Sequence, residues 1–142
     1  MKTKIILFSL LSIPFLTSTI LPRNNIQTQK NIIKHMAELD IQMRNIASQI
    51  AIGYDIEAGR SAKRLLRAAK KYDAIYKRAL PVVGNSNRKV NTSQQMKELR
   101  KESTKLYKVI TQNRGNYQKM LNQYSRVVKS CRACHKKLEV NY

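Results

Sequence analysis

Apolar side chains recur three or four residues apart along four separate segments of this sequence, and this spacing constrains the fold more than any other feature. The first such segment begins at Asn31. Its apolar stripe consists of Ile32, Met36, Leu39, Met43, Ile46 and Ile50. Steps that alternate between four and three residues place side chains on one face of an α-helix. The spacing therefore predicts a helix with one buried face.

Three further segments repeat the pattern. The second stripe consists of Ala62, Leu65, Ala69, Tyr72, Tyr76 and Ala79. The third consists of Met96, Leu99, Ser103, Leu106 and Ile110. The fourth consists of Tyr117, Met120, Tyr124, Val127, Cys131, Cys134 and Leu138. Because glycine and proline are scarce, the many turns of a strand-rich fold are missing, and we expect an all-α protein.

Two short turns and one longer loop separate the predicted helices. The turns lie at 53–55 and 115–117, in equivalent places of two helical hairpins. The segment 81–92 gathers proline, glycine, serine and asparagine, which predicts the longest loop. Since short turns favour antiparallel neighbours, we expect an antiparallel up-down-up-down four-helix bundle.

Side chains that could cap two of these helices follow the turn and the loop. Asp55 is expected to be the N-cap of the second helix. Thr92 and Gln95 have the spacing of a capping box at the start of the third helix.

The first residues have the pattern of a secretory signal. Lys2 and Lys4 precede an apolar run from Ile5 to Leu16, which is too short to span a bilayer comfortably. We expect residues 1–22 to be the signal peptide, with its cleavage point open, and residues 23–142 to form one exported, periplasmic domain. The alternative is an uncleaved signal that keeps the protein at the membrane, since the usual Ala-x-Ala is missing.

The chain is strongly basic. Its formal net charge is +20, and loss of Lys2 and Lys4 with the signal leaves +18. Such a charge attracts acidic partners and anionic surfaces and resists self-association. Nucleic acid is the usual partner of so basic a protein, but export argues against it.

Both cysteines of the chain lie in the sequence Cys131-Arg132-Ala133-Cys134-His135. The pattern Cys-x-x-Cys-His is the attachment signature of c-type haem. Two thiols three residues apart lie on one face of a helix, where both can bond to the vinyl groups of the haem, and the next histidine can bind the iron. We therefore expect covalent haem c on Cys131 and Cys134, with its iron bound by His135.

Three other interpretations of the two cysteines are weaker. A thioredoxin-like redox pair needs a βαβ context, which the helical pattern does not supply. A structural zinc site usually needs four ligands, and His35 is the one histidine or cysteine that remains. A disulfide between residues so close in sequence would constrain little of the unfolded chain.

A second iron ligand is expected from the first helix, whose start lies beside the end of the fourth in an up-down-up-down bundle. Met36 is placed there and has a suitable thioether, whereas Met43 lies about 10 Å farther along the helix axis. His35 is rotated by about 100° from Met36, so we expect it to be a flanking, solvated residue. The remaining alternative is no sixth protein ligand, with Ile33 or another apolar side chain over the distal face.

These features resemble the cytochrome c′ superfamily, the class II c-type cytochromes, which are four-helix bundles with Cys-x-x-Cys-His near the C-terminus. The likeness covers roughly Thr28 to Leu138. The stretch YSRVVKSCRACHKKL is similar to the last helix of that family, and HMAELDIQMRNI is similar to its first. The latter also resembles the opening helix of the soluble b-type four-helix cytochromes, which implies that Met36 binds iron. The c′ branch often has a basic residue four positions after the haem histidine, whereas this chain has Glu139.

We expect a periplasmic cytochrome that carries single electrons through an iron with His135 and Met36 as axial ligands. No enzyme activity is expected, since paired carboxylates and nucleophile–base pairs were not found. Arg132, Lys136 and Lys137 are expected around the haem edge, where they would balance the propionates or dock an acidic redox partner.

Two other functions stay open. One is a five-coordinate haem protein, similar to cytochrome c′, that binds nitric oxide or carbon monoxide. The other is a basic exported protein that binds polyanions and carries no haem. The resemblance also allows a homodimer, although no exposed apolar patch can be identified in the sequence.

Overall fold

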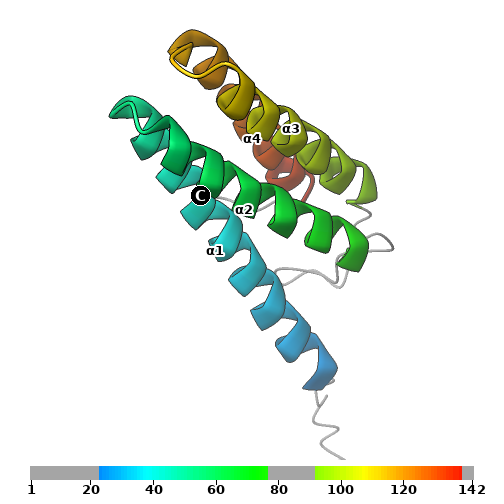
Figure 1. The fold of residues 1–142 in the computed structure, drawn as a ribbon. Coiled ribbons are helices and arrows are strands. Elements are labelled where there is room, and N and C mark those ends of the chain that lie inside the picture. Colours follow the sequence, from blue (N-terminus) through cyan, green and yellow to red (C-terminus); the bar gives the residue numbers. More distant parts are fainter. Residues whose placement is uncertain (1–22, 77–91, 139–142) are drawn as a thin grey trace, which may run out of the picture.

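The computed structural model describes residues 23–76 and 92–138, and these residues form four helices (Figure 1). The helices are α1 (Arg23–Ala51), α2 (Asp55–Ile75), α3 (Ser93–Gln112) and α4 (Tyr117–Leu138). The described residues contain no strand, so the all-α prediction is confirmed for them. The expected signal peptide, Ala79 of the second stripe, most of the expected loop at 81–92, and Glu139 lie outside these residues. None of the four helices is long and apolar enough to cross a membrane.

The predicted apolar stripes form the core. Ile46, Leu65, Leu106 and Val127, one from each helix, are fully buried. Burying a side chain of this size contributes roughly 1.5–3 kcal/mol relative to leaving it in water. Tyr117 differs from the prediction because 43% of its surface is exposed. It is the first residue of α4, where its neighbour is the α1–α2 turn and not a helix.

Helices that follow one another in the chain pack closely, and the packing is compatible with a bundle. Between α2 and α3, the guanidinium of Arg100 lies 2.8 Å from the carboxylate of Asp73. Between α3 and α4, the amide of Gln123 donates a hydrogen bond of 2.7 Å to the buried carboxylate of Glu102. The helices α1 and α4 contact each other much less than any of these pairs.

Two glycines form the short turns. Gly53 and Gly115 have φ angles of 78° and 77°, in the left-handed region that glycine adopts without a steric penalty. Asp55 is not the N-cap of α2, as the sequence had suggested, because Tyr54 takes that position without a side-chain cap. The carboxylate of Asp55 accepts a hydrogen bond of 2.8 Å from the backbone N–H of Gly115 and so joins the two turns.

The predicted capping box at the start of α3 does not form. Thr92 is the N-cap residue and is buried, but its side chain makes no capping hydrogen bond. Gln95 instead lines the cavity described below. The side chain of Gln95 therefore lies at the cavity.

Candidate functional site

A cavity of about 310 Å³ opens between α1 and α4, where those two helices contact each other little. Its walls come mainly from α1 and α4, and α2 and α3 contribute Leu65, Gln95, Met96 and Leu99. A volume of this size lies at the lower end of the range for small-molecule and cofactor sites, roughly 300–1,000 Å³. The cavity therefore has both the apolar lining and the size of a binding site.

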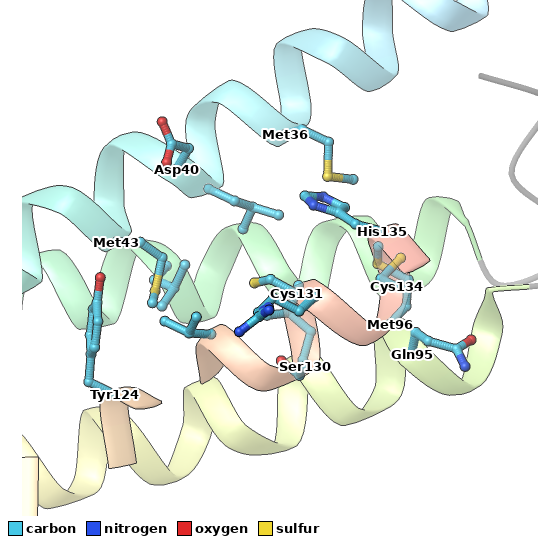
Figure 2. A pocket seen from close by; sticks show the side chains of 15 residues that line it. Met36, Asp40, Met43, Gln95, Met96, Tyr124, Ser130, Cys131, Cys134 and His135 are labelled. Atoms are coloured by element: carbon cyan, nitrogen blue, oxygen red, sulfur yellow. The ribbon is translucent and has the colours of Figure 1, made fainter. Parts of the chain in front are cut away.

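Both cysteines line this cavity from the last turns of α4 (Figure 2). Cys134 is buried, Cys131 is half-buried, and both are free thiols. Burial raises the pKa of Cys131. Burial, together with the neighbouring Cys131, raises the pKa of Cys134 to about 11. Both sulfur atoms are therefore neutral thiols at neutral pH, as their apolar surroundings require.

His135 lines the same cavity from the next position of α4. It is half-buried, and this burial lowers the pKa of its imidazole. A lowered pKa favours the neutral ring, which is the form of histidine that binds a metal ion. Burial therefore favours the neutral ring of His135 at neutral pH.

Two methionines of α1 also reach the cavity. Met36 is half-buried and points toward His135, whereas the buried Met43 lies beside Tyr124 (Figure 2). The fold therefore brings the four predicted site residues Met36, Cys131, Cys134 and His135 to one cavity.

The prediction for His35 was wrong. Its imidazole does not line the cavity but stacks on the ring of Tyr72 in α2, with ring centroids 4.1 Å apart. A hydrogen bond of 2.6 Å joins its Nδ1 to the hydroxyl of Tyr76. Burial, followed by the charge of Lys71, lowers the pKa of the ring. His35 is held between helices α1 and α2, so it is not a solvated flanking residue.

Ile33 also differs from its expected place. It is 62% exposed and does not line the cavity, so it does not cover the distal face of the site. The reason is its position on α1, three residues before Met36 but one residue after the buried Ile32 of the apolar stripe. Met36, in contrast, lines the cavity and is half-buried.

Three polar residues of the cavity wall were not predicted from the sequence: Asp40, Gln95 and Ser130. Asp40 lies four residues after Met36 and forms an ion pair of 2.8 Å with Arg44 at the surface. That spacing places Asp40 on the same helix face as Met36 and could have identified it. Gln95 carries no such signal, since its place depends on how α3 packs against α4.

The basic residues beside the cysteines occupy different positions. Arg132 is exposed and lines the mouth of the cavity. Lys136 and Lys137 are exposed in the last turn of α4 and are not among the cavity residues. Of these three basic residues, Arg132 is therefore the one placed to contact a negatively charged group in the cavity.

The residues of the cavity fit a haem. Within 23–76 and 92–138, no three His, Cys, Asp or Glu side chains are grouped so that they alone could hold a metal ion. A haem iron takes only one or two ligands from the protein, since the porphyrin supplies the others. The cavity offers an imidazole and a thioether from different helices, two thiols on one helix face, and apolar walls.

Comparison with known proteins gives no relative: no family model, curated protein or solved structure matches this chain. The functional assignment therefore depends on the residues of the cavity.

Proposed function

We propose that this protein is a periplasmic c-type cytochrome that carries single electrons, with haem attached to Cys131 and Cys134 and with His135 and Met36 as axial iron ligands. One observation carries the proposal. Two thiols, an imidazole and a thioether line a single apolar cavity between two helices that otherwise contact each other little. The haem would supply the change between ferric and ferrous iron.

Each side chain of the cavity has a separate task in this proposal. The two thiols anchor the cofactor to α4 and hold it beside His135. Met36 binds from α1, and a methionine opposite histidine favours the ferrous state relative to two histidines. Leu39 and Leu99 keep water from the iron, which favours the state of lower charge. Arg132 at the mouth balances the negative charge of the propionates.

The proposal includes the antiparallel up-down-up-down order of the helices and membership of the cytochrome c′ superfamily. The contact of His35 with Tyr76 supports this order, since it joins the first half of α1 to the residue that follows α2. The ion pair of Asp73 with Arg100 joins the end of α2 to the first half of α3. With this order the middle of α1, from Met36 to Met43, would lie beside the last turns of α4, and both segments line the cavity.

The test is to express the full chain in a bacterial host with the c-type maturation machinery. We expect the purified protein to gain the mass of one haem and to keep it after denaturation. We also expect a low-spin spectrum with a sulfur-to-iron band. The double variant C131A/C134A should lose the covalent haem. A wild-type protein without added mass in that host would overturn the proposal and would favour the polyanion-binding alternative.

Met36 and Met43 give a matched pair for the axial ligand, because both line the cavity from α1. The substitution M36L should abolish the sulfur-to-iron band and give a high-spin or altered spectrum. M43L should leave the band in place. A high-spin spectrum of the wild-type protein would reject Met36 and would support the five-coordinate, gas-binding alternative.

A further inference from the structure

Exposed apolar side chains gather at the end of the molecule that carries the two short turns, away from Met36 and His135. The described residues include eight large apolar side chains with substantial exposure, and five of them belong to two short segments. These five are Ile52, Tyr54, Ile56, Tyr117 and Leu121, each between 43% and 61% exposed. We call residues 52–56 and 114–121 the turn end. A group of apolar side chains exposed to water in one place is typical of an interaction site.

The two segments of the turn end form one surface. The backbone N–H of Gly115 donates to the carboxylate of Asp55 across 2.8 Å. A side-chain atom built on Gly53 would lie 3.2 Å from the hydroxyl of Tyr117, so the α1–α2 turn packs directly against the start of α4. In Figure 1 both turns stand at the same end of the helices. The exposed side chains therefore project together.

Positive charge surrounds this surface. Arg60, Lys63 and Arg114 line a shallow depression together with Ile56, and all three are exposed. Lys119 is exposed in the first turn of α4. The nearby acids are engaged within the protein.

Those two acids are Asp55 and Glu57. The carboxylate of Asp55 accepts the hydrogen bond from Gly115, and that of Glu57 pairs with Arg60 at 3.0 Å. The turn end thus combines apolar side chains with an excess of cations.

We propose that the turn end docks onto a bilayer surface that contains anionic phospholipid, with Ile52, Tyr54 and Ile56 entering the headgroup region. Tyrosine and aliphatic side chains surrounded by lysine and arginine are the usual composition of such a surface. A bilayer accepts projecting side chains without matching their shape, which suits turns at the end of a long helical molecule. A second copy is a poor occupant, since each copy carries a net charge near +20.

Docking through this end would leave the cavity open to other proteins. Met36 and Ile52 are separated along the axis of α1 by about 24 Å at 1.5 Å per residue, a little more than half the length of that helix. Met36 would then lie well above the bilayer surface. The proposal goes beyond the proposed function and holds whether or not haem is attached.

The test compares two triple variants of the full chain by sedimentation with vesicles of phosphatidylcholine and about 30% phosphatidylglycerol. The turn-end variant is I52S/I56S/L121S, and the matched control I33S/I41S/I75S removes three exposed aliphatic side chains elsewhere. We expect the turn-end variant to bind at least about 10-fold more weakly than the wild type, and the control to stay within about 2-fold. The mass of each purified protein is checked first, because an uncleaved signal would itself bind the vesicles and mask the difference.

A second readout reports the depth of insertion. The chain contains no tryptophan, so Y54W and I33W each introduce a single fluorescent reporter. We expect the emission of Y54W to shift to shorter wavelength when these vesicles are added, and that of I33W to stay unchanged. Equal binding of the two triple variants, or an unshifted Y54W, would overturn the proposal. Dimerisation in solution that is lost only in the turn-end variant would overturn it in favour of a second copy.

Discussion

Helix α1 has two neighbours, and its interfaces with them differ. Toward α2, the buried ring of Tyr72 stacks on His35, and its hydroxyl donates a hydrogen bond to Glu38. Toward α4, the same helix presents Met36 and Met43 to an open cavity. The α1–α2 interface is closed by aromatic and polar contacts, whereas the α1–α4 interface keeps space for a ligand.

We expect the α1–α2 interface to contribute mainly to stability and the α1–α4 interface mainly to ligand binding. Side chains at the closed interface have many contacts to lose, so substitutions there should cost the most free energy of unfolding. Side chains at the cavity already border empty space, so substitutions there should cost less and should change ligand binding instead. Variants at the two kinds of interface test this difference in stability and binding.

The substitution Y72A removes the aromatic centre of the α1–α2 interface. Because Tyr72 is fully buried, we expect the free energy of unfolding to fall by about 3–5 kcal/mol in urea titrations. The control Y72F keeps the ring and loses only the hydrogen bond to Glu38, which should cost about 1 kcal/mol. A loss below about 1 kcal/mol for Y72A would contradict the expectation that the α1–α2 interface contributes most to stability.

The cavity should protect its thiols when no haem is attached. The pKa of Cys134 is raised from 9.0 to about 11, so its thiolate fraction at pH 8 falls by about 100-fold. In the C131S variant burial still raises the pKa of Cys134, but the contribution of Cys131 is gone. Alkylation of Cys134 at pH 8 should therefore be slower in the folded protein than in urea, by up to about 100-fold, and the folded rate should rise with pH as the thiol loses its proton. Equal rates in the folded and unfolded states would mean that the cavity does not bury this sulfur.

Two adjacent valines of α4 compare core and cavity directly. Val127 is fully buried in the core, and the half-buried Val128 lines the cavity. We expect V127A to lower the free energy of unfolding by about 2 kcal/mol and V128A by less than about 1 kcal/mol. Chemical denaturation of the haem-free protein measures both. A larger loss for V128A would show that the α1–α4 interface is packed as tightly as the others.

The closed α3–α4 interface contains a buried carboxylate that makes its stability depend on pH. Burial alone would raise the pKa of Glu102, but hydrogen bonds from Lys105 and Gln123 and the charge of Lys101 hold that pKa below its usual value. A lowered pKa stabilises the folded state above the unfolded value of about 4.5, and this stability is lost as the pH falls through the folded pKa.

Substitution of this carboxylate by an amide tests the direction of the effect. E102Q should lower stability by about 1 kcal/mol at pH 7. It should also reduce the loss of stability on acidification from pH 5 to pH 3, measured by thermal unfolding against pH. E98Q is the control, since Glu98 is an exposed residue of the same helix that pairs with Lys101. An unchanged pH profile in E102Q would contradict the assigned role.

The helices and the core could be predicted because their signal is local. Leu65 and Leu106 are buried as the stripes required, and Gly53 and Gly115 form the turns that their neighbours had indicated. His35 was misplaced because a rotation of 100° from Met36 excludes the cavity but does not say what lies on the other side. Tyr72 of α2 and Tyr76, which follows that helix, come into contact with His35 only when the helices pack.

The turn end was missed for a related reason. Ile52 and Tyr54 lie more than 60 residues from Tyr117 in the sequence, and neither segment would be unusual alone. They become one surface because Gly115 bonds to Asp55 and brings the two turns together. The same holds for the cavity, whose walls come from all four helices.

Residue spacing was sufficient for the four helices and for the unit of two thiols and an imidazole, since these features depend on neighbours within one or two helical turns. Packing was needed to learn which helix pair stays open, that Met36 shares a cavity with His135, and that His35 does not. The physical reason is that these relations depend on distances between helices far apart in the chain, where the many weak contacts of the whole core set the positions.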